Sequence, residues 1–146
     1  ARIRLIRDGD VAGALMTCKD DSGIDLLLGI GGSPEAVISA CAIKCVGGNM
    51  QCRLWPRNDE EAARCRELGM DLSRVLTLDD LVASDNVFFA ATGVTDGEFL
   101  KGVKYQGDKI KTTSMVMRSK SGTIRYVEAI HQLDKLDKIS GIDYKS

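Results

Sequence analysis

The stretch that decides the fold is Leu26-Leu27-Leu28 followed directly by Gly29-Ile30-Gly31-Gly32-Ser33-Pro34-Glu35. A continuous apolar run is typical of a strand that is buried on both faces of a parallel sheet. The residues after the glycines suit a helix start, with Ser33 as N-cap and Pro34 as first helical residue. The stretch therefore predicts a strand, a glycine-rich turn and a helix that ends at Gly47-Gly48.

The flanking segments continue this alternation of strands and helices. The pattern predicts strands at 3–6, 50–54, 75–77 and 87–91, and helices at 11–18, 58–69 and 78–82. Further on, residues 112–118 and 123–130 indicate a β-hairpin around the turn 119–122. The tail 133–146 is polar and is expected to fray. We therefore expect one α/β domain over residues 1–146, with a mostly parallel or mixed sheet flanked by helices and a carboxy-terminal β-hairpin.

Composition restricts the class of protein. The chain has 146 residues, 44% of them hydrophobic, and a formal net charge of -1, so no basic excess favours nucleic acid or an anionic membrane. No apolar run approaches the roughly 20 residues that span a bilayer. The five cysteines include no C-x-x-C pair, which favours reduced thiols in a cytoplasmic protein. Because Ala1 is not Met and a strand-like segment follows at once, we expect a piece of a longer chain.

Three polar loops follow predicted strands: Asp8-Gly9-Asp10, residues 29–35 and residues 92–97. The carboxyl ends of parallel strands meet at one edge of a sheet, so these loops are expected to converge there. Backbone amides of the glycine loop and the following helix start would bind a phosphate. Glu35 would repel that anion unless a cation lay between them, so it points to a metal–phosphate site. Plain helix capping by the acidic residues is the alternative, and for Asp96 a structural turn is the preferred interpretation.

Other chemistry is poorly supported by the sequence. The glycine loop has no Gly-Lys-Ser/Thr ending, and Pro34 stands where a dinucleotide-binding fingerprint would have its third glycine. A nucleotide- or dinucleotide-binding module that uses Gly29 to Gly32 stays open as the alternative function. His131 has no partner at a catalytic spacing and is interpreted as a bystander.

Several motifs together carry a family resemblance. Asp8-Gly9-Asp10-Val11-Ala12 and the loop 29–37, followed by 44–51, 90–97 and 112–118, resemble the class II, GlpX-type fructose-1,6-bisphosphatases. That family includes cyanobacterial enzymes that also accept sedoheptulose 1,7-bisphosphate. The motifs stand in the family's order and cover nearly the whole chain.

The resemblance implies the second, α/β half of the lithium-sensitive, metal-dependent phosphatase fold. It implies hydrolysis of the 1-phosphate of fructose 1,6-bisphosphate with Mn²⁺ or Mg²⁺, in cytoplasmic gluconeogenesis or glycerol metabolism. Carried over by position, Asp8, Gly9, Asp10 and Gly32 would bind substrate, and Glu35 would be a metal ligand. The family's other metal ligands lie in an amino-terminal half that this chain lacks, and no catalytic residue is assigned here. We therefore expect a half-site that is inactive and only partly metal-binding alone, whose partners are that missing half and further copies of itself.

Overall fold

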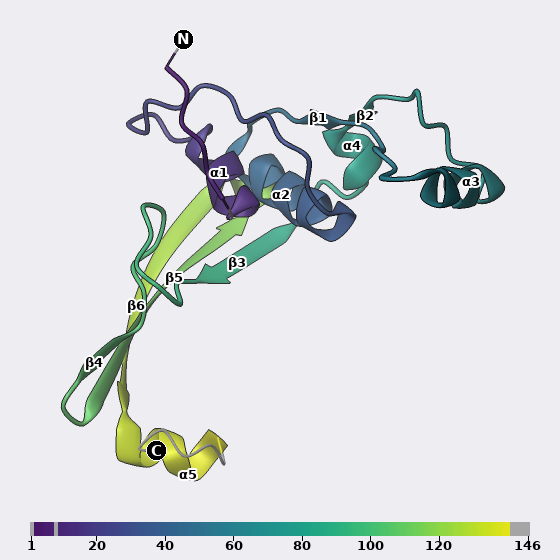
Figure 1. The fold of residues 1–146 in the computed structure, drawn as a ribbon. Helices are drawn as coiled ribbons and strands as arrows, with labels where there is room; N and C mark the ends of the chain where they lie inside the picture. The colour runs from purple at the N-terminus through teal and green to yellow at the C-terminus, as the bar shows by residue number, and fades with distance from the viewer. Residues whose placement is uncertain (1, 8, 141–146) are drawn as a thin grey trace.

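The computed structural model describes residues 2–7 and 9–140. Helices and strands alternate first, and the strands of a larger sheet follow (Figure 1). The elements are α1 (Asp10–Met16), α2 (Ser33–Val46), β1 (Gln51–Cys52), α3 (Asp59–Glu67), β2 (Leu76–Thr77), α4 (Leu78–Leu81), β3 (Phe88–Thr92), β4 (Lys104–Gln106), β5 (Lys109–Arg118), a 3-10 turn at Ser119–Ser121, β6 (Thr123–Gln132) and α5 (Leu133–Ser140).

The strands form two antiparallel sheets. β1 pairs with β2, while β5 pairs with β3 and β4 along one edge and with β6 along the other. The predicted hairpin is confirmed, with Arg118 opposite Thr123 across the turn. No parallel pair occurs among the described strands, so the mostly parallel or mixed sheet of the sequence analysis is not the sheet that these residues form. The α/β class itself is confirmed.

The physical reason lies in two segments that were predicted to be parallel strands. The predicted strands 3–6 and 26–28 lie in segments 2–7 and 24–30, which contain no helix or strand and pair with no described strand. Their side chains alternate: Ile6 and Leu27 lie against α1 near Gly13, whereas others point outward, with Leu5 91% and Leu28 82% exposed. An apolar run is buried on both faces only when it lies in a sheet that is covered on both faces, and the described residues leave these segments uncovered on one side.

The core forms where α1 and α2 lie on one face of the larger sheet (Figure 1). Met115 and Met117 of β5 are each 1% exposed and pack among residues of α1, α2 and β3. Cys45 of α2 belongs to the same cluster, and burial raises the pKa of its thiol. All five cysteines are free. Among the described helices, none is long and apolar enough to cross a membrane.

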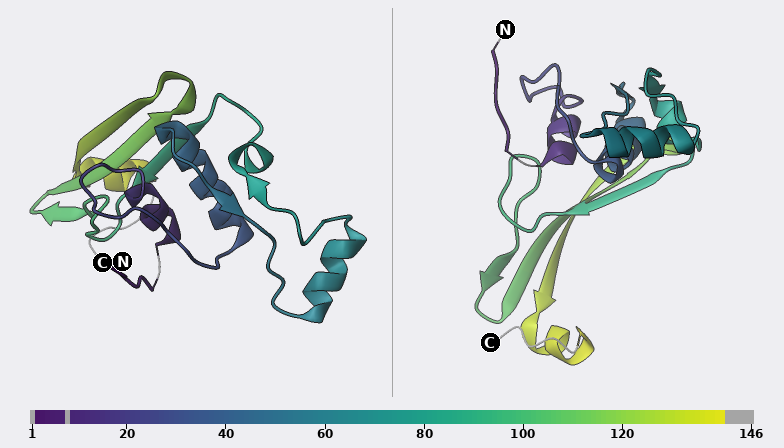
Figure 2. Two further views of the ribbon diagram at one scale, coloured as in Figure 1. Left: turned by 90° about the horizontal axis from the view of Figure 1, so that it is seen from above. Right: turned by 45° about the vertical axis from the view of Figure 1, so that its right-hand side comes forward.

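Local capping signals place the ends of several helices. α2 ends at Gly47, which adopts left-handed angles with φ 75°. The side chain of Asn58 accepts a hydrogen bond from the Glu61 amide and caps the start of α3. Thr77 and Asp80 form a capping box at α4. Figure 2 shows α3 standing apart from the larger sheet, which agrees with its having no buried residue.

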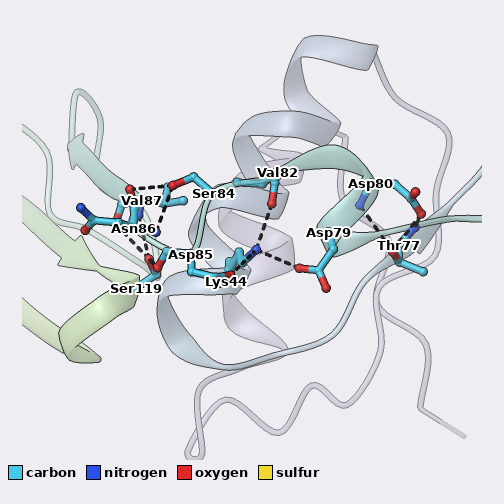
Figure 3. A network of polar contacts seen from close by, with 10 residues as sticks. All are labelled: Lys44, Thr77, Asp79, Asp80, Val82, Ser84, Asp85, Asn86, Val87 and Ser119. Atoms are coloured by element: carbon cyan, nitrogen blue, oxygen red, sulfur yellow. Dashed lines mark hydrogen bonds and ion pairs between the residues drawn. The ribbon is translucent and has the colours of Figure 1, made fainter.

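Lys44 joins α2 to the segment that enters β3 (Figure 3). Its ammonium donates to Asp79 Oδ1 at 2.8 Å and to the Val82 carbonyl at 2.9 Å, and Asp85 Oδ1 lies at 3.2 Å. The hydrogen bond to Asp79 is the main reason why the pKa of Lys44 is raised. This contact fixes the carboxyl end of the helix whose other end carries the glycine loop.

Two boundaries differ from the sequence prediction. Gly32, not Ser33, is the N-cap of α2, because the first helical hydrogen bond runs from the Ala36 amide to the Gly32 carbonyl. A frayed tail was expected from residue 133, but Leu133–Ser140 forms α5, and the Leu133 amide donates to the Asp108 carbonyl at 2.8 Å. Residues 141–146 of that prediction lie outside the described residues.

Candidate functional site

Two of the three predicted loops meet at the amino-terminal ends of α1 and α2. Gly9 adopts left-handed angles, with φ 79°, and as N-cap it makes Asp10 the first residue of α1. The Asp10 carboxylate then lies against the glycine loop: a Cβ built on Gly31 would be 2.8 Å from Asp10 Oδ2. The structure therefore brings the loops around Asp10 and Gly31 together, as the sequence predicted. Asp8 lies outside the described residues.

Glu35 lies over the same loop. Its Oε2 occupies the space that a Cβ on Gly32 would need, so the carboxylate folds back across the start of α2. No side chain caps this helix end, and the amides of Ser33 and Glu35 have no hydrogen-bond partner among the described residues. Unpaired amides and the helix dipole favour an anion at this position. A carboxylate and an anion-binding helix end thus lie side by side.

The third loop is held together internally. The Asp96 carboxylate accepts a hydrogen bond from the Gly102 amide at 2.9 Å and forms an ion pair with Lys104. The Lys104 hydrogen bond, followed by that of Gly102, holds the pKa of Asp96 below its usual value. These contacts agree with the structural-turn interpretation of Asp96.

His131 has a structural contact in the sheet. Its Nε2 lies 3.1 Å from Thr112 Oγ1, the hydroxyl of a residue on the neighbouring strand β5. The sequence interpretation of His131 as a bystander agrees with this contact.

Sequence reasoning missed two contacts. It did not predict that Gly31 faces the Asp10 carboxylate across the loops, and the substrate role of Gly32 stays a prediction. It also missed the ion pair between Arg4 and Glu98, which ties the amino-terminal segment to the loop after β3. The Gly31-Gly32 pair could have indicated that carboxylates lie close to this loop, because a Cβ at either position would collide with Asp10 or Glu35. No local sequence pattern could have indicated an ion pair between residues as far apart in sequence as Arg4 and Glu98.

The donor atoms near this loop suit a hard divalent cation. Mg²⁺ and similar ions prefer carboxylate and carbonyl oxygens, and Glu35 with Asp10 supplies oxygens only. Across residues 2–7 and 9–140, however, no group of three or more His, Cys, Asp or Glu side chains could hold a metal ion. Glu35 therefore fits one position in a ligand set, and the rest of such a set is not formed by the described residues.

A family comparison agrees with this geometry. The sequence profile described as "Bacterial fructose-1,6-bisphosphatase, glpX-encoded" matches residues 1–131. The chain belongs to this family. The resemblance drawn from the motifs is thereby confirmed, and the nucleotide-binding alternative finds no support.

Curated relatives of this glpX-type chain carry the same description. A "Fructose-1,6-bisphosphatase class 2" of Haemophilus influenzae is 45% identical over 155 aligned residues, which cover 97% of this chain and 46% of that protein. A "Fructose-1,6-bisphosphatase 1 class 2" of Escherichia coli strain K12 is 42% identical over 149 aligned residues, covering 93% and 44%. The chain thus spans slightly less than half the length of these relatives.

Proposed function

We propose that this chain is the substrate-binding half of a metal-dependent phosphatase that hydrolyses the 1-phosphate of fructose 1,6-bisphosphate. The observation that carries the proposal is the meeting of Asp10, Gly31 and Glu35 at the uncapped start of α2. An anion-binding helix end beside carboxylates suits a phosphate that arrives together with a cation. Family membership assigns this chemistry to a class 2 fructose-1,6-bisphosphatase.

Each residue has a separate role in this proposal. Asp8, Gly9 and Asp10 hold the sugar phosphate, and Gly32 lets the substrate approach the backbone closely. The amides of Ser33 and Glu35 face the phosphate at the helix start. Glu35 holds one metal ion, and Mn²⁺ or Mg²⁺, when bound, supplies activation of water and stabilisation of the leaving oxygen.

The chain requires a second half for activity. Glu35 alone does not complete a two-metal site, and the relatives are about twice as long as this chain. The extended segments 2–7 and 24–30, with their outward apolar side chains, are the surface that the other half covers. Packing of the other half against these outward side chains would remove water from large apolar surface. The whole enzyme adopts the lithium-sensitive phosphatase fold and works in the cytoplasm in gluconeogenesis or glycerol metabolism.

The test is phosphate release from fructose 1,6-bisphosphate in the presence of Mn²⁺. The chain is assayed alone and joined to the amino-terminal half of the Haemophilus influenzae relative. We expect no turnover from the short chain and measurable turnover from the joined protein. Turnover by the short chain would overturn the half-site proposal, and an inactive but folded joined protein would overturn the phosphatase assignment.

Glu35→Ala in the joined protein tests the metal role. Removing a metal ligand should lower activity by at least about 100-fold. Glu60→Ala is the matched control, because Glu60 is also an exposed glutamate in the first turn of a helix. Near-normal turnover by Glu35→Ala, or an equal loss in the control, would reject the role of Glu35.

A further inference from the structure

The β3–β4 loop, residues 93–103, contains most of the third polar loop of the sequence analysis and has no role in the proposed function. The Gly93 amide donates to the Thr113 carbonyl of β5 at 3.0 Å, which fixes the start of the loop to the sheet. The Val103 amide donates to the Val94 carbonyl at 3.1 Å, so the two ends of the loop are bonded to each other. The loop therefore has a defined shape where it leaves and re-enters the sheet.

The two sides of the β3–β4 loop are in close contact. A Cβ on Gly93 would overlap the Lys101 carbonyl oxygen. A Cβ on Gly102 would lie 2.5 Å from the Thr95 carbonyl carbon, and the Gly102 amide donates to the Asp96 carboxylate at 2.9 Å. Close backbone contact of this kind leaves the loop little freedom to change its shape.

The β3–β4 loop packs on the same core cluster as α1. Phe99 and Leu100 are partly buried and lie against the cluster that contains Leu15 of α1. Val11, which directly follows Asp10 in the chain, packs against this cluster as well. The loop and the first turn of α1 therefore rest on one set of buried side chains.

The β3–β4 loop also contacts the segment that leads to α1 (Figure 2). The Arg4 guanidinium donates to Glu98 Oε1 at 2.5 Å, and this hydrogen bond holds the pKa of Glu98 below its usual value. Residues 2–7 join no described sheet, so their position depends on side-chain contacts such as this one and that of Ile6 near Gly13 of α1. Glu98 is thus an anchor for a segment that has no strand partner among the described residues.

We propose that the β3–β4 loop holds Asp10 in place against Gly31, and that Glu98 is a positioning residue for the phosphatase reaction. Glu98 acts through Arg4, which stands six residues before Asp10 in the chain. The inference rests on the proposed role of Asp10 in substrate binding. A shift of the segment would move the Asp10 carboxylate relative to Gly31, and a misplacement of about 1 Å can reduce rate about 100-fold.

The effect should appear in substrate binding rather than in overall stability. Both side chains of the Arg4–Glu98 pair are 56% exposed, and an exposed ion pair contributes little to the free energy of unfolding. The proposed role of Asp10 is to hold the sugar phosphate, which is bound in the ground state and in the transition state alike. Loss of such binding raises KM and leaves kcat nearly unchanged.

The first test is the steady-state kinetics of the joined protein with fructose 1,6-bisphosphate and Mn²⁺. Glu98→Arg replaces the ion pair by two like charges, and we expect it to raise KM at least about fivefold with kcat changed less than about twofold. Exchanging the two side chains, Arg4→Glu with Glu98→Arg, restores the pair and should return KM to within about twofold of wild type. The midpoints of urea unfolding should agree among the three proteins.

Glu60→Arg is the matched control, because it makes the same charge change at an exposed glutamate of α3. An added positive charge attracts an anionic substrate, so a general charge effect would lower KM rather than raise it. An unchanged KM in Glu98→Arg, an equal rise in Glu60→Arg, or a rise that the exchanged pair does not reverse would overturn the inference.

The second test is hydrogen exchange followed by mass spectrometry, which needs no turnover. The Gly13 amide donates to the Gly9 carbonyl at 2.9 Å in the first turn of α1. Because Glu98 holds the segment before this turn, Glu98→Arg should speed exchange of the α1 amides at least about threefold, while the amides of α2 exchange as in wild type. Exchange of α1 at the wild-type rate would overturn the inference.

The two tests separate this inference from the proposed function. Turnover by the joined protein, with KM and exchange unchanged in Glu98→Arg, would overturn the role of Glu98 and leave the phosphatase assignment in place. A folded joined protein without turnover would overturn the phosphatase assignment. Faster exchange of α1 in Glu98→Arg would then still support the contact through which the β3–β4 loop holds Asp10.

Discussion

Gly31→Ala is predicted to damage the site without damaging the fold. The new Cβ would stand 2.8 Å from Asp10 Oδ2, and ordinary contact begins at 3.4 Å, so the carboxylate has to move by about 0.6 Å. Asp10 is an exposed side chain with free rotamers, so this movement should cost less than about 0.5 kcal/mol of stability. A misplacement of about 1 Å in a positioning group can reduce rate 100-fold, so we expect about a tenfold loss in kcat/KM.

The assay is phosphate release by the joined protein, with unfolding by urea as the stability readout. Gly29→Ala is the matched control, because nothing lies within 4 Å of a Cβ at that position. The effect should operate through Asp10, so Gly31→Ala added to Asp10→Ala should cause little further loss. Wild-type activity in Gly31→Ala, or a tenfold loss that persists in the Asp10→Ala background, would refute the reasoning.

Three further predictions concern stability. Gly48→Ala places a Cβ 2.5 Å from Cys18 Sγ and should lower the free energy of unfolding, measured in urea, by about 1–3 kcal/mol. Adding Cys18→Ala to this variant should recover part of the loss, because the remaining Cβ of residue 18 is 3.8 Å away. Equal stability of Gly48→Ala and wild type would contradict this prediction. Thr77→Val removes the N-cap of α4 and should cost about 1 kcal/mol, seen as a lower melting temperature; an unchanged melting temperature would count against it. The Lys104 hydrogen bond lowers the pKa of Asp96 in the folded protein. The ionised Asp96 therefore stabilises the fold above the usual carboxyl pKa of about 4, and this stabilisation is lost as pH falls through the lowered pKa of the folded state. The free energy of unfolding of Asp96→Asn should therefore fall less steeply at acidic pH than that of wild type. An equally steep fall in both proteins would argue against the contact.

Much of the local structure could be predicted because its causes are local. The stop of α2 at Gly47 and the Asn58 cap of α3 follow from one or two residues each. The hairpin of β5 and β6 follows from two β-rich segments joined by a short turn. The glycine loop and Glu35 were found in the same way, since a helix start with glycines and an acid is readable over seven residues.

Longer-range features needed the folded chain. The run Leu26-Leu27-Leu28 predicts a buried strand, but such burial requires a sheet covered on both faces, and residues 24–30 join no described sheet. For Asp96 the sequence favoured a structural turn, but it did not identify Lys104 as the partner that engages the carboxylate. Ion pairs of this kind depend on loop closure rather than on spacing.

The sequence by itself determined the family, the presence of the helices α1 to α4, and the residues Gly9, Asp10, Gly32 and Glu35 as site candidates, because each rests on short motifs. Only the tertiary structure decided that the Asp10 carboxylate lies against Gly31 and that the Gly102 amide and Lys104 engage Asp96. The reason is physical: contact between two loops depends on how α1 and α2 pack on the sheet, and that packing is a property of the whole core.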